Sequence, residues 1–275
     1  MSNPGNEPPA FGLVIIGDEI LSGRRQDKHL ERVVDILAQR GLMLSYAHYV
    51  GDDPQRIAAT LKQAFDSGDV VFSTGGIGAT PDDHTRACAA QALGVPLLMH
   101  PEAKALIIER MQELAARKGE TFDPEQPDSI HRLNMAVFPE GAEIIPNPYN
   151  KIAGFSCRGA AGGAVHFVPG FPVMAWPMIE WVLDTHCAHW HHLNPHEERS
   201  VIVKGAMEAA LTPLMLEIEQ NFEGVKVFSL PSVDHPQYGR HIELGVKGPP
   251  SRVEPAFEQL LLALRSSGAD LGPQA

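Results

Sequence analysis

The chain has 275 residues, of which 44% are hydrophobic and 20% charged, and this composition is typical of a globular protein with one large or two modest domains. Burial of about 70% or more of the unfolded surface is accessible to a chain this long, which excludes a stapled miniprotein and wholesale disorder. Acidic residues outnumber basic ones by 34 to 22, giving a formal net charge of −12 at pH 7. Since no run of Lys or Arg offsets this charge, we expect no nucleic-acid partner.

The cysteines and the start of the chain bear on the cellular compartment. Cys88, Cys157 and Cys187 are far apart and form no CxxC pair, so they indicate neither a disulfide framework nor a thiolate metal cage. Residues 1–10 have no basic start and no apolar core, and they are therefore interpreted as a disordered leader and not a signal peptide. No apolar stretch approaches the roughly 20 residues that a membrane span needs. We expect a cytoplasmic protein with no membrane partner.

The first 95 residues alternate between strand patterns and helix patterns. Short apolar runs predict buried strands, and amphipathic stretches closed by glycine predict helices. In chain order the elements are a strand at 11–17, a helix at 27–41, a strand at 42–50, a helix at 53–68, a strand at 69–73 and a helix at 83–93. This alternation predicts an α/β fold with a parallel sheet wrapped by helices through right-handed crossovers.

The remainder of the chain completes this domain and adds a second one. The further elements predicted for the first domain are helices at 101–118 and near Ser129, short strands at 142–145, 152–157 and 165–168, and a helix at 171–190. Asn194 and Pro195 mark a boundary, after which strands at 199–204, 225–230 and 241–246 and helices at 211–222 and 253–265 predict a small α+β domain. The expected organisation is a leader at 1–10, domains at 11–193 and 197–268, and a frayed tail at 269–275.

The glycine-rich loop at 74–85 has the strongest functional pattern. It follows a predicted buried strand and precedes a helix, so its glycines can present backbone N–H groups to an anion beside the positive end of the helix dipole. This pattern predicts phosphate binding. The alternative is a simple turn in which Asp82 or Asp83 caps the next helix. The candidate ligand residues in this loop are Thr74, Gly75, Gly76, Gly78, Thr80, Asp82 and Thr85.

A second loop follows the carboxyl end of the first strand. If that strand lies beside the strand at 69–73, both loops open onto one crevice. Asp18 and Glu19 are candidates to cap or ligate, Ser22 is a candidate to bond a hydroxyl or phosphate, and Asp27 is as well explained as a helix cap. Gly17 completes the candidate ligand residues of this loop.

Two carboxylates follow the predicted second strand. One of Asp52 and Asp53 is explained as the cap of the next helix, and the other is surplus. Because parallel strands bring their carboxyl ends to one rim, the surplus aspartate, Asp83 and neighbouring acids are expected to gather there. Clustered carboxylates favour a hard divalent cation, and we expect Mg²⁺ bridged to phosphate oxygens, with Asp83 and Asp53 as candidate metal ligands.

Five motifs in order carry a resemblance to a known family. They are GDEILSG, VGDD, STGGIGATPDDHTR, the Pro146-Asn147-Pro148 turn followed by Ala153-Gly154-Phe155, and VPGFP at 168–172. From about residue 11 to 190 the chain resembles the MoaB/Mog molybdopterin-binding domain family, most closely the amino-terminal domain of the competence/damage-inducible CinA proteins. Residues 199–266 resemble the small α+β segment that follows it there, and we expect this sequence to lack the nicotinamide-mononucleotide deamidase domain that many of them append.

The resemblance implies a three-layer α/β domain that binds a phosphorylated pterin or nucleotide at the carboxyl ends of its strands. By motif it assigns catalytic roles to Asp52 and Asp83, and it adds Asn147, Pro169 and Gly170 as ligand residues. CinA-like relatives are described as metal-dependent pyrophosphatases that act on ADP-ribose or FAD, and this is the expected function. The alternatives are a non-catalytic molybdopterin carrier and a molybdopterin adenylyltransferase like the Mog proteins. Relatives form dimers or trimers, so a homo-oligomer is expected.

Overall fold

The structure, a computed structural model, describes residues 8–193 and 197–274 and consists of two compact units, Met1–His191 and His192–Ala275. The expected boundary at Asn194 and Pro195 lies outside the described residues, as does the expected leader up to residue 7. Each unit has its own hydrophobic core.

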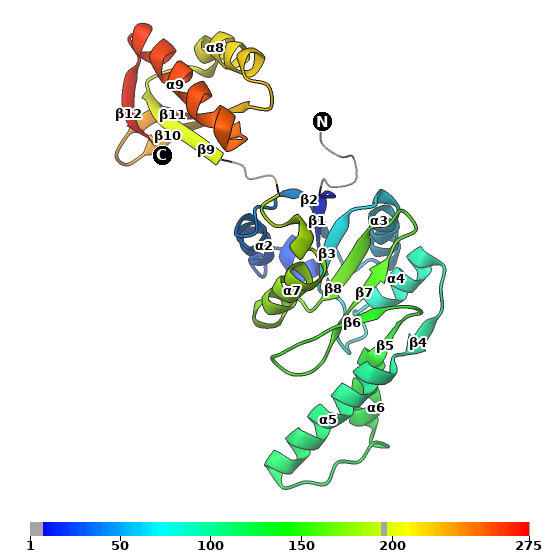
Figure 1. The fold of residues 1–275 in the computed structure, drawn as a ribbon. Coiled ribbons are helices and arrows are strands. Elements are labelled where there is room, and N and C mark those ends of the chain that lie inside the picture. The colour runs from blue at the N-terminus through cyan, green and yellow to red at the C-terminus, as the bar shows by residue number, and fades with distance from the viewer. Residues whose placement is uncertain (1–7, 194–196, 275) are drawn as a thin grey trace. The chain divides into compact units, whose positions relative to one another are not determined.

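The first unit contains a six-stranded sheet with helices on both faces (Figure 1). Its elements are β1 (Phe11–Ile16), α1 (Asp18–Leu21), α2 (His29–Ala38), β2 (Leu44–Val50), α3 (Pro54–Ser67), β3 (Val70–Thr74), α4 (Thr85–Leu93), β4 (Leu97–Met99), α5 (Pro101–Lys118), α6 (Pro127–Leu133), η1 (Asn134–Ala136), β5 (Val137–Pro139), β6 (Glu143–Ile145), β7 (Gly154–Arg158), β8 (Ala164–Val168), α7 (Pro172–His186) and η2 (Ala188–Trp190).

The strand order β2-β1-β3-β8-β7-β6 places the functional loops. The strands β2, β1, β3 and β8 are parallel, and β7 runs antiparallel to both β8 and β6, so the expected mostly parallel sheet is confirmed. β1 pairs directly with β3, with Phe11 opposite Val70 and Ile15 opposite Thr74. The loops after these two strands therefore leave the sheet at the same edge.

The apolar run of β1 is explained by helices on both sides of the sheet. Val14 and Ile16 belong to the core on the side of α3 and α4, whereas Leu13 and Ile15 belong to the core on the side of α2 and α7 (Figure 1). Because successive side chains of a strand point to opposite faces, a strand buried on both faces needs apolar residues at every position.

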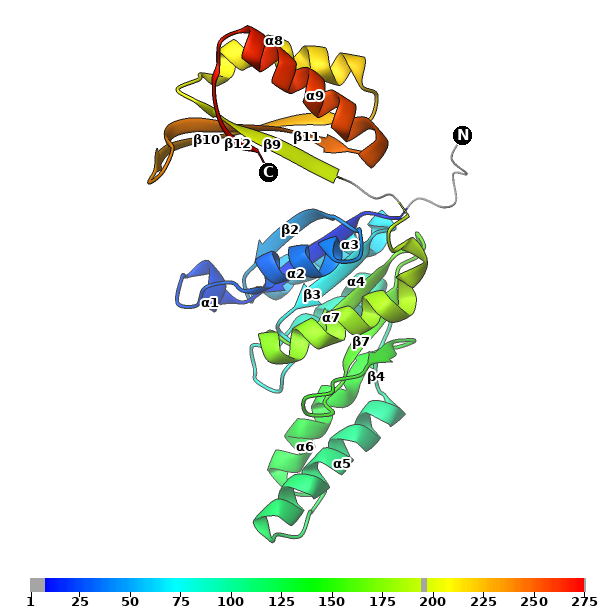
Figure 2. The same ribbon diagram turned by 60° about the vertical axis from the view of Figure 1, so that its left-hand side comes forward.

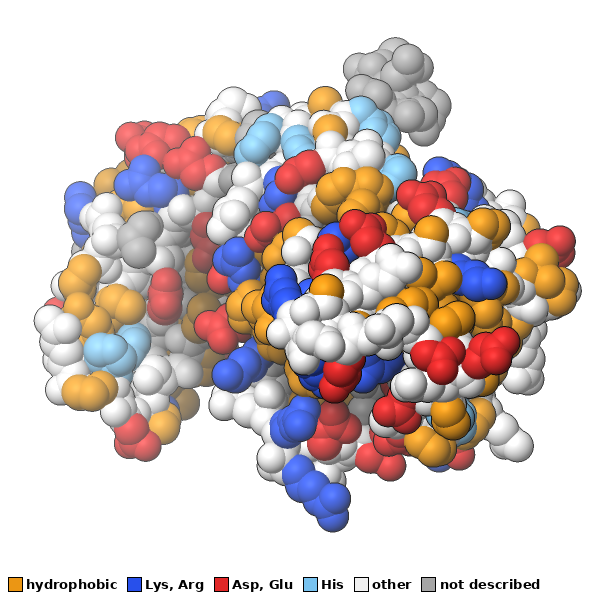
Figure 3. Space-filling view, turned by 90° about the horizontal axis from the view of Figure 1, so that it is seen from below, with side chains coloured by type: hydrophobic (Ala, Val, Ile, Leu, Met, Phe, Trp, Pro, Cys, Tyr) orange, Lys and Arg blue, Asp and Glu red, His pale blue; other side chains and the backbone are white. Residues whose placement is uncertain are grey.

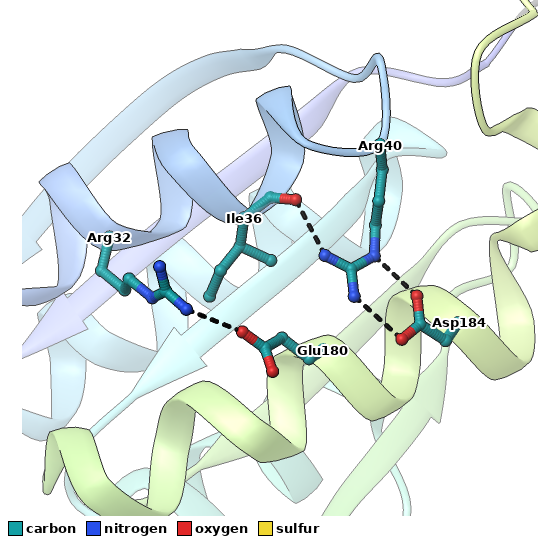
Figure 4. A network of polar contacts seen from close by, with 5 residues as sticks. All are labelled: Arg32, Ile36, Arg40, Glu180 and Asp184. Carbon is teal, nitrogen blue, oxygen red and sulfur yellow. Dashed lines mark hydrogen bonds and ion pairs between the residues drawn. The ribbon is translucent and has the colours of Figure 1, made fainter.

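Ion pairs join the two helices on one face of the sheet. Arg40 at the end of α2 forms a bidentate pair with Asp184 of α7, with Nε–Oδ1 2.6 Å and Nη2–Oδ2 2.8 Å, and it also donates to the Ile36 carbonyl (Figure 4). Arg32 Nη2 lies 2.9 Å from Glu180 Oε1. These contacts hold α2 against α7, whose first residues flank the carboxyl ends of β1 and β3.

A helical hairpin and a short ribbon lie at one end of the unit. α5 and α6 contact each other and extend away from the sheet in Figures 1 and 2. β4 pairs antiparallel with β5, and the sequence patterns did not predict this ribbon because three-residue strands are too short to display a period. The chain between β4 and β5 passes through α5, α6 and η1, and η1 lies at the edge of the site described below.

The second unit has an antiparallel sheet of order β10-β11-β9-β12 and two helices that cover one of its faces (Figure 2). Its elements are β9 (Glu197–Lys204), α8 (Glu208–Asn221), β10 (Lys226–His235), β11 (Gly239–Gly248), α9 (Pro250–Ser266) and β12 (Asp270–Gln274). The expectation of a frayed tail from residue 269, after a domain ending at 268, is wrong for residues 270–274. Asp270 pairs with Lys204 and Leu271 with Val203, so this segment is an edge strand, a position that tolerates its proline.

The surface of the described segments shows no separation of charged from apolar side chains on the face that is drawn in Figure 3. The face in Figure 3 carries acidic, basic and apolar side chains intermixed. Within residues 8–193 and 197–274, no helix is both long enough and apolar enough to cross a membrane.

Candidate functional site

Four loops at the carboxyl ends of the parallel strands line a single cavity of about 450 Å³, here called the first cavity. They follow β1, β2, β3 and β8, and the β6–β7 connection adds a further wall. The expected site residues that line it are Gly17, Glu19, Asp52, Gly75, Gly76, Gly78, Thr80, Asp82, Asp83, Asn147, Pro169 and Gly170. The convergence that the strand order implied is therefore present in the fold.

The glycine loop after β3 needs glycine for steric reasons. Gly75 and Gly76 have φ angles of 96° and 66°, in the region that side chains disfavour. A Cβ on Gly75 would meet the carbonyl oxygen of Ile16 in β1, and one on Gly76 would meet Thr85 Oγ1. Two glycines in sequence thus allow the chain to turn between the ends of β1 and β8.

Asp83 holds this loop in shape. Its Oδ1 accepts the Gly78 amide at 2.8 Å, and its Oδ2 accepts the Thr80 amide at 2.7 Å and the Thr80 hydroxyl at 2.5 Å. Arg86 of α4 donates hydrogen bonds to the carbonyl oxygens of Ile77 and Gly78. Neither Asp82 nor Asp83 occupies the N-cap position of α4, which is His84, so the expectation that one of them caps this helix is wrong.

The loop offers fewer free amides than the glycine count suggests. The Gly75 amide donates to the Val168 carbonyl at 3.1 Å, and the Gly78 amide is taken by Asp83. Within the described part of the chain, the amides of Gly76, Ile77 and Ala79 donate to no protein acceptor. A bound anion is therefore expected against residues 76–79 rather than against all three glycines.

Acidic residues of the loops after β1 and β2 gather at the cavity. Asp18 and Asp52 bond reciprocally, with Asp18 N to Asp52 Oδ2 at 2.9 Å and Asp52 N to Asp18 Oδ1 at 3.2 Å. Burial raises the pKa of Asp52 above its ordinary value, and the nearby charges of Asp18, Glu19 and Asp82 raise it further, against the lowering effect of the Asp18 amide. Asp52 is therefore a carboxyl group that exchanges its proton closer to neutral pH than an ordinary aspartate.

Two expected residues serve the scaffold instead of the cavity. Asp53 is the N-cap of α3, where its Oδ1 accepts the Arg56 amide at 2.9 Å, and it does not line the cavity. Thr85 is buried and donates its hydroxyl to the Gly75 carbonyl at 3.1 Å. Of the two adjacent aspartates, Asp53 is thus the cap and Asp52 is the surplus acid.

Asp27, Ser22 and Asp18 also lie outside the first cavity. Asp27 accepts the His29 amide at 2.8 Å and the Leu30 amide at 3.1 Å at the start of α2, and it accepts the Tyr49 hydroxyl at 2.8 Å. Ser22 is exposed at the end of α1. Asp18 contributes through its pair with Asp52. The helix-cap explanation of Asp27 is the one that the contacts support.

Thr74, the last residue of β3, lines a different hollow. This second cavity, of about 320 Å³, lies beside the start of α2 and the start of α7. Asn147 is buried, with its Nδ2 donating to the Ile152 carbonyl at 2.9 Å and its Oδ1 accepting the Tyr149 amide at 3.0 Å, so it shapes the β6–β7 turn from within.

The sequence patterns missed several lining residues. Arg25 is a cation at the edge of both cavities, and its place in the loop after β1 was the only available signal. The other wall is largely apolar; Ala153 and Phe171 stand in two of the five motifs, whereas the rest of this wall has no motif of its own. The residues of this wall are Met135, Ile152, Ala153, Phe171 and Met174, with Asn150 among them.

The side chains in the described segments set a limit on metal binding. Within residues 8–193 and 197–274, no group of three or more His, Cys, Asp or Glu side chains is arranged to hold a metal ion. A cage made by the protein alone is therefore not present there. Mg²⁺ is commonly held by one or two carboxylates together with substrate phosphates, and the acids around the first cavity fit that mode.

Comparison with known proteins places this fold in a family. Residues 12–189 match the family described as "Probable molybdopterin binding domain". A CinA-like protein of Gloeobacter violaceus is 34% identical over 164 residues, which are 60% of this chain and 36% of that protein. A protein of Pyrobaculum calidifontis is 28% identical over 264 residues, covering 94% of this chain and 97% of its own.

A solved structure supports the same assignment. The protein CinA from Thermoplasma acidophilum, described as having unknown function, matches 64% of this chain and 97% of its own with 26% identity and a TM-score of 0.54. The present chain spans less than half the length of the CinA-like relatives it matches, with 36%, 40% and 37% of three of them aligned. The family match covers most of the first unit, its motifs line one cavity, and the chain belongs to the MoaB/Mog-like molybdopterin-binding domain family, on its CinA-like side.

Proposed function

We propose that the first cavity binds the diphosphate of a dinucleotide such as ADP-ribose or FAD and hydrolyses its phosphoanhydride bond, releasing AMP. The observation that carries the proposal is that unpaired loop amides and a carboxyl group of raised pKa face the same cavity. The amides suit the charge of the substrate, and the carboxyl group suits the activation of water.

Binding of the diphosphate is supported by the glycine loop and by Arg25. The residues Gly76, Ile77 and Ala79 line the cavity, and their amides, which donate to no acceptor within the described segments, are available to phosphate oxygens. Arg25 adds a full positive charge and a planar set of donors at the edge. Because these amides are fixed before the substrate arrives, they also stabilise the charge that develops on the phosphate oxygens in the transition state.

Asp52 is the general base in this proposal. A water molecule attacks one phosphorus atom and passes its proton to the Asp52 carboxylate, the bridging P–O bond breaks, and AMP and the second phosphate ester leave. A base works best when its pKa approaches the working pH, and burial, together with the nearby charges of Asp18 and Glu19, moves the pKa of Asp52 in that direction. The reciprocal bonds with Asp18 fix its orientation.

A divalent metal would be held by Asp83 with Asp82, both of which line the cavity. Asp83 accepts three hydrogen bonds from the loop, which leaves about one of the roughly four acceptor positions of a carboxylate. When bound, Mg²⁺ supplies positive charge that neutralises phosphate oxygens. Asp53 has no place in this arrangement, since its carboxylate caps α3.

The test is AMP release from ADP-ribose and FAD in the presence of Mg²⁺, Mn²⁺ or Co²⁺. We expect release by the wild-type protein and a loss of about 100-fold or more in Asp52→Asn, the size usual for a general base. Asp66→Asn is the matched control, because Asp66 is an exposed acid on α3 that pairs with Lys62 and does not line the cavity. No AMP from the wild type with any metal rejects hydrolysis, and unchanged release in Asp52→Asn shows that Asp52 is not the base.

Binding of molybdopterin without turnover is the second candidate. It is favoured by the apolar wall of Met135, Ile152, Phe171 and Met174, which suits a flat heterocycle, and by the molybdopterin-binding family. Copurified pterin fluorescence that survives gel filtration would support it. A calorimetric titration with molybdopterin that gives no heat of binding would discard it.

A further inference from the structure

The second cavity is continuous in its walls with the first. Both are lined by Ile16, Glu19, Arg25, Gly170 and Phe171, so the two cavities adjoin along this shared wall. The first cavity opens over the glycine loop, whereas the second lies between the start of α2 and the start of α7. The proposed function uses only the first.

Two buried polar side chains of the second cavity lack partners. His29 is 4% exposed and Thr74 is 1% exposed, and both line this cavity. In the described structure, His29 Nδ1 and Thr74 Oγ1 make no hydrogen bond. Leaving a buried polar group unpaired is costly, so two of them on one cavity indicate that a polar group of a ligand belongs there.

The hydrogen bonding of His29 defines what that group must offer. Its Nε2 lies 3.0 Å from the Gly170 carbonyl oxygen, which can only accept, so Nε2 carries the hydrogen. In the neutral imidazole Nδ1 is then an acceptor. A phosphate group at neutral pH offers mainly acceptors and does not satisfy Nδ1, whereas a hydroxyl group donates to it, and the Thr74 hydroxyl can donate or accept.

The charges of the second cavity lie at its mouth. Arg25, Lys28 and Glu19 are exposed lining residues, while the unpaired His29 and Thr74 are buried. Two cations against one carboxylate leave a positive balance at the mouth, and together with an acceptor at the floor this matches a ligand with a phosphate at one end and hydroxyl groups at the other.

We propose that the second cavity binds the hydroxyl groups of a phosphorylated sugar, with its phosphate at the wall shared by the two cavities. His29 Nδ1 accepts a hydrogen bond from one sugar hydroxyl, and Thr74 Oγ1 bonds another. Arg25 contacts the phosphate. This inference rests on the proposed function, because it assigns a place to the ribose of a substrate whose diphosphate occupies the first cavity.

The experiment compares calorimetric affinities for ribose 5-phosphate and for inorganic phosphate, neither of which contains an anhydride bond. Wild type, Thr74→Val and His29→Gln are measured; glutamine keeps an amide nitrogen for the Gly170 carbonyl and removes the Nδ1 acceptor. We expect wild type to prefer ribose 5-phosphate, and each variant to lose about tenfold of that affinity, or about 1.4 kcal/mol, with phosphate affinity unchanged within about twofold.

The stability of Thr74→Val separates this role from a structural one. Since the Thr74 hydroxyl has no partner, its removal is expected to leave the melting temperature of the free protein unchanged or higher. Equal wild-type affinity for the two probes, no binding of either, or an unchanged preference in both variants overturns the inference. If the protein releases AMP from ADP-ribose but binds ribose 5-phosphate no better than phosphate, only the sugar site in the second cavity is rejected. If it prefers ribose 5-phosphate but releases no AMP, only the proposed hydrolysis is rejected.

Discussion

Replacement of Asp83 by alanine tests whether the glycine loop is shaped by a single carboxylate. The substitution removes the acceptor of the Gly78 amide, the Thr80 amide and the Thr80 hydroxyl, all within 2.8 Å. It also removes a negative charge near Arg86, whose pKa is lowered by burial and raised in opposition by Asp83. We expect the loop to lose its fixed shape and the unit to lose stability.

The size of the effect follows from the exposure of the donors. Hydrogen bonds to a charged group contribute about 1.5–3 kcal/mol each when buried, but Thr80 is exposed and Gly78 only half-buried, so the freed donors reach water. At about 1 kcal/mol for each of three bonds, the loss is about 2–3 kcal/mol. For a unit of this size, that corresponds to a fall in melting temperature of about 4–12 °C.

The assay combines urea denaturation with hydrogen exchange at the Gly78 and Thr80 amides. Asp83→Asn is the graded control, because its single oxygen can keep the bond from one of these residues but not from both. We expect exchange at both amides to accelerate in Asp83→Ala and at one of them in Asp83→Asn. Wild-type exchange rates at Gly78 and Thr80 in the alanine variant would refute the argument.

Three further predictions concern individual polar groups. Because the folded-state pKa of Asp52 is raised, its ionised form lowers the free energy of unfolding at pH 7. Asp52→Asn is therefore expected to be more stable than wild type in urea at pH 7 and equal to it at pH 3, where both side chains are neutral. Equal stability at pH 7 would contradict this reasoning. Asp53→Ala is expected to lose about 1 kcal/mol by urea denaturation and Asp53→Asn almost nothing, since asparagine also caps helices; equal losses would exclude the cap. Arg40→Ala is expected to lower the free energy of unfolding by about 1 kcal/mol, and a double-mutant cycle with Asp184 is expected to assign most of this loss to the interaction between the two side chains. An interaction energy of zero would mean that the bidentate pair contributes nothing to stability.

The layered fold is predictable because each of its signals is local. The six apolar residues of β1 and the left-handed glycine that ends α3 at Gly68 fix strand and helix without reference to the rest of the chain. β4, β5 and α1 have three or four residues each, too few to show a period. β12 is formed by pairing with β9, and nothing in its own composition indicates it.

The sequence predicts where the site lies, but it predicts less well what each residue does there. The order of strands in a parallel sheet brings residues near 18, 52 and 83 together whatever their side chains do. Asp52 and Asp53 are the same residue type at adjacent positions, and only the direction of the backbone makes one a cap and the other a cavity residue. Arg25 stands in no helix or strand, so its contribution depends on the path of a loop.

Gly170 lies where the two cavities meet, and this position links them. Gly170 lines both cavities and its carbonyl oxygen lies 3.0 Å from His29 Nε2, so this exposed glycine belongs to the wall that the two cavities share. If a fragment in one cavity shifted Gly170, the affinity of the other cavity would change, and thermodynamic reciprocity would make the factor the same in both directions. Two halves of a single substrate, supplied as separate molecules, would then act as mutual effectors, each changing the equilibrium affinity of the other.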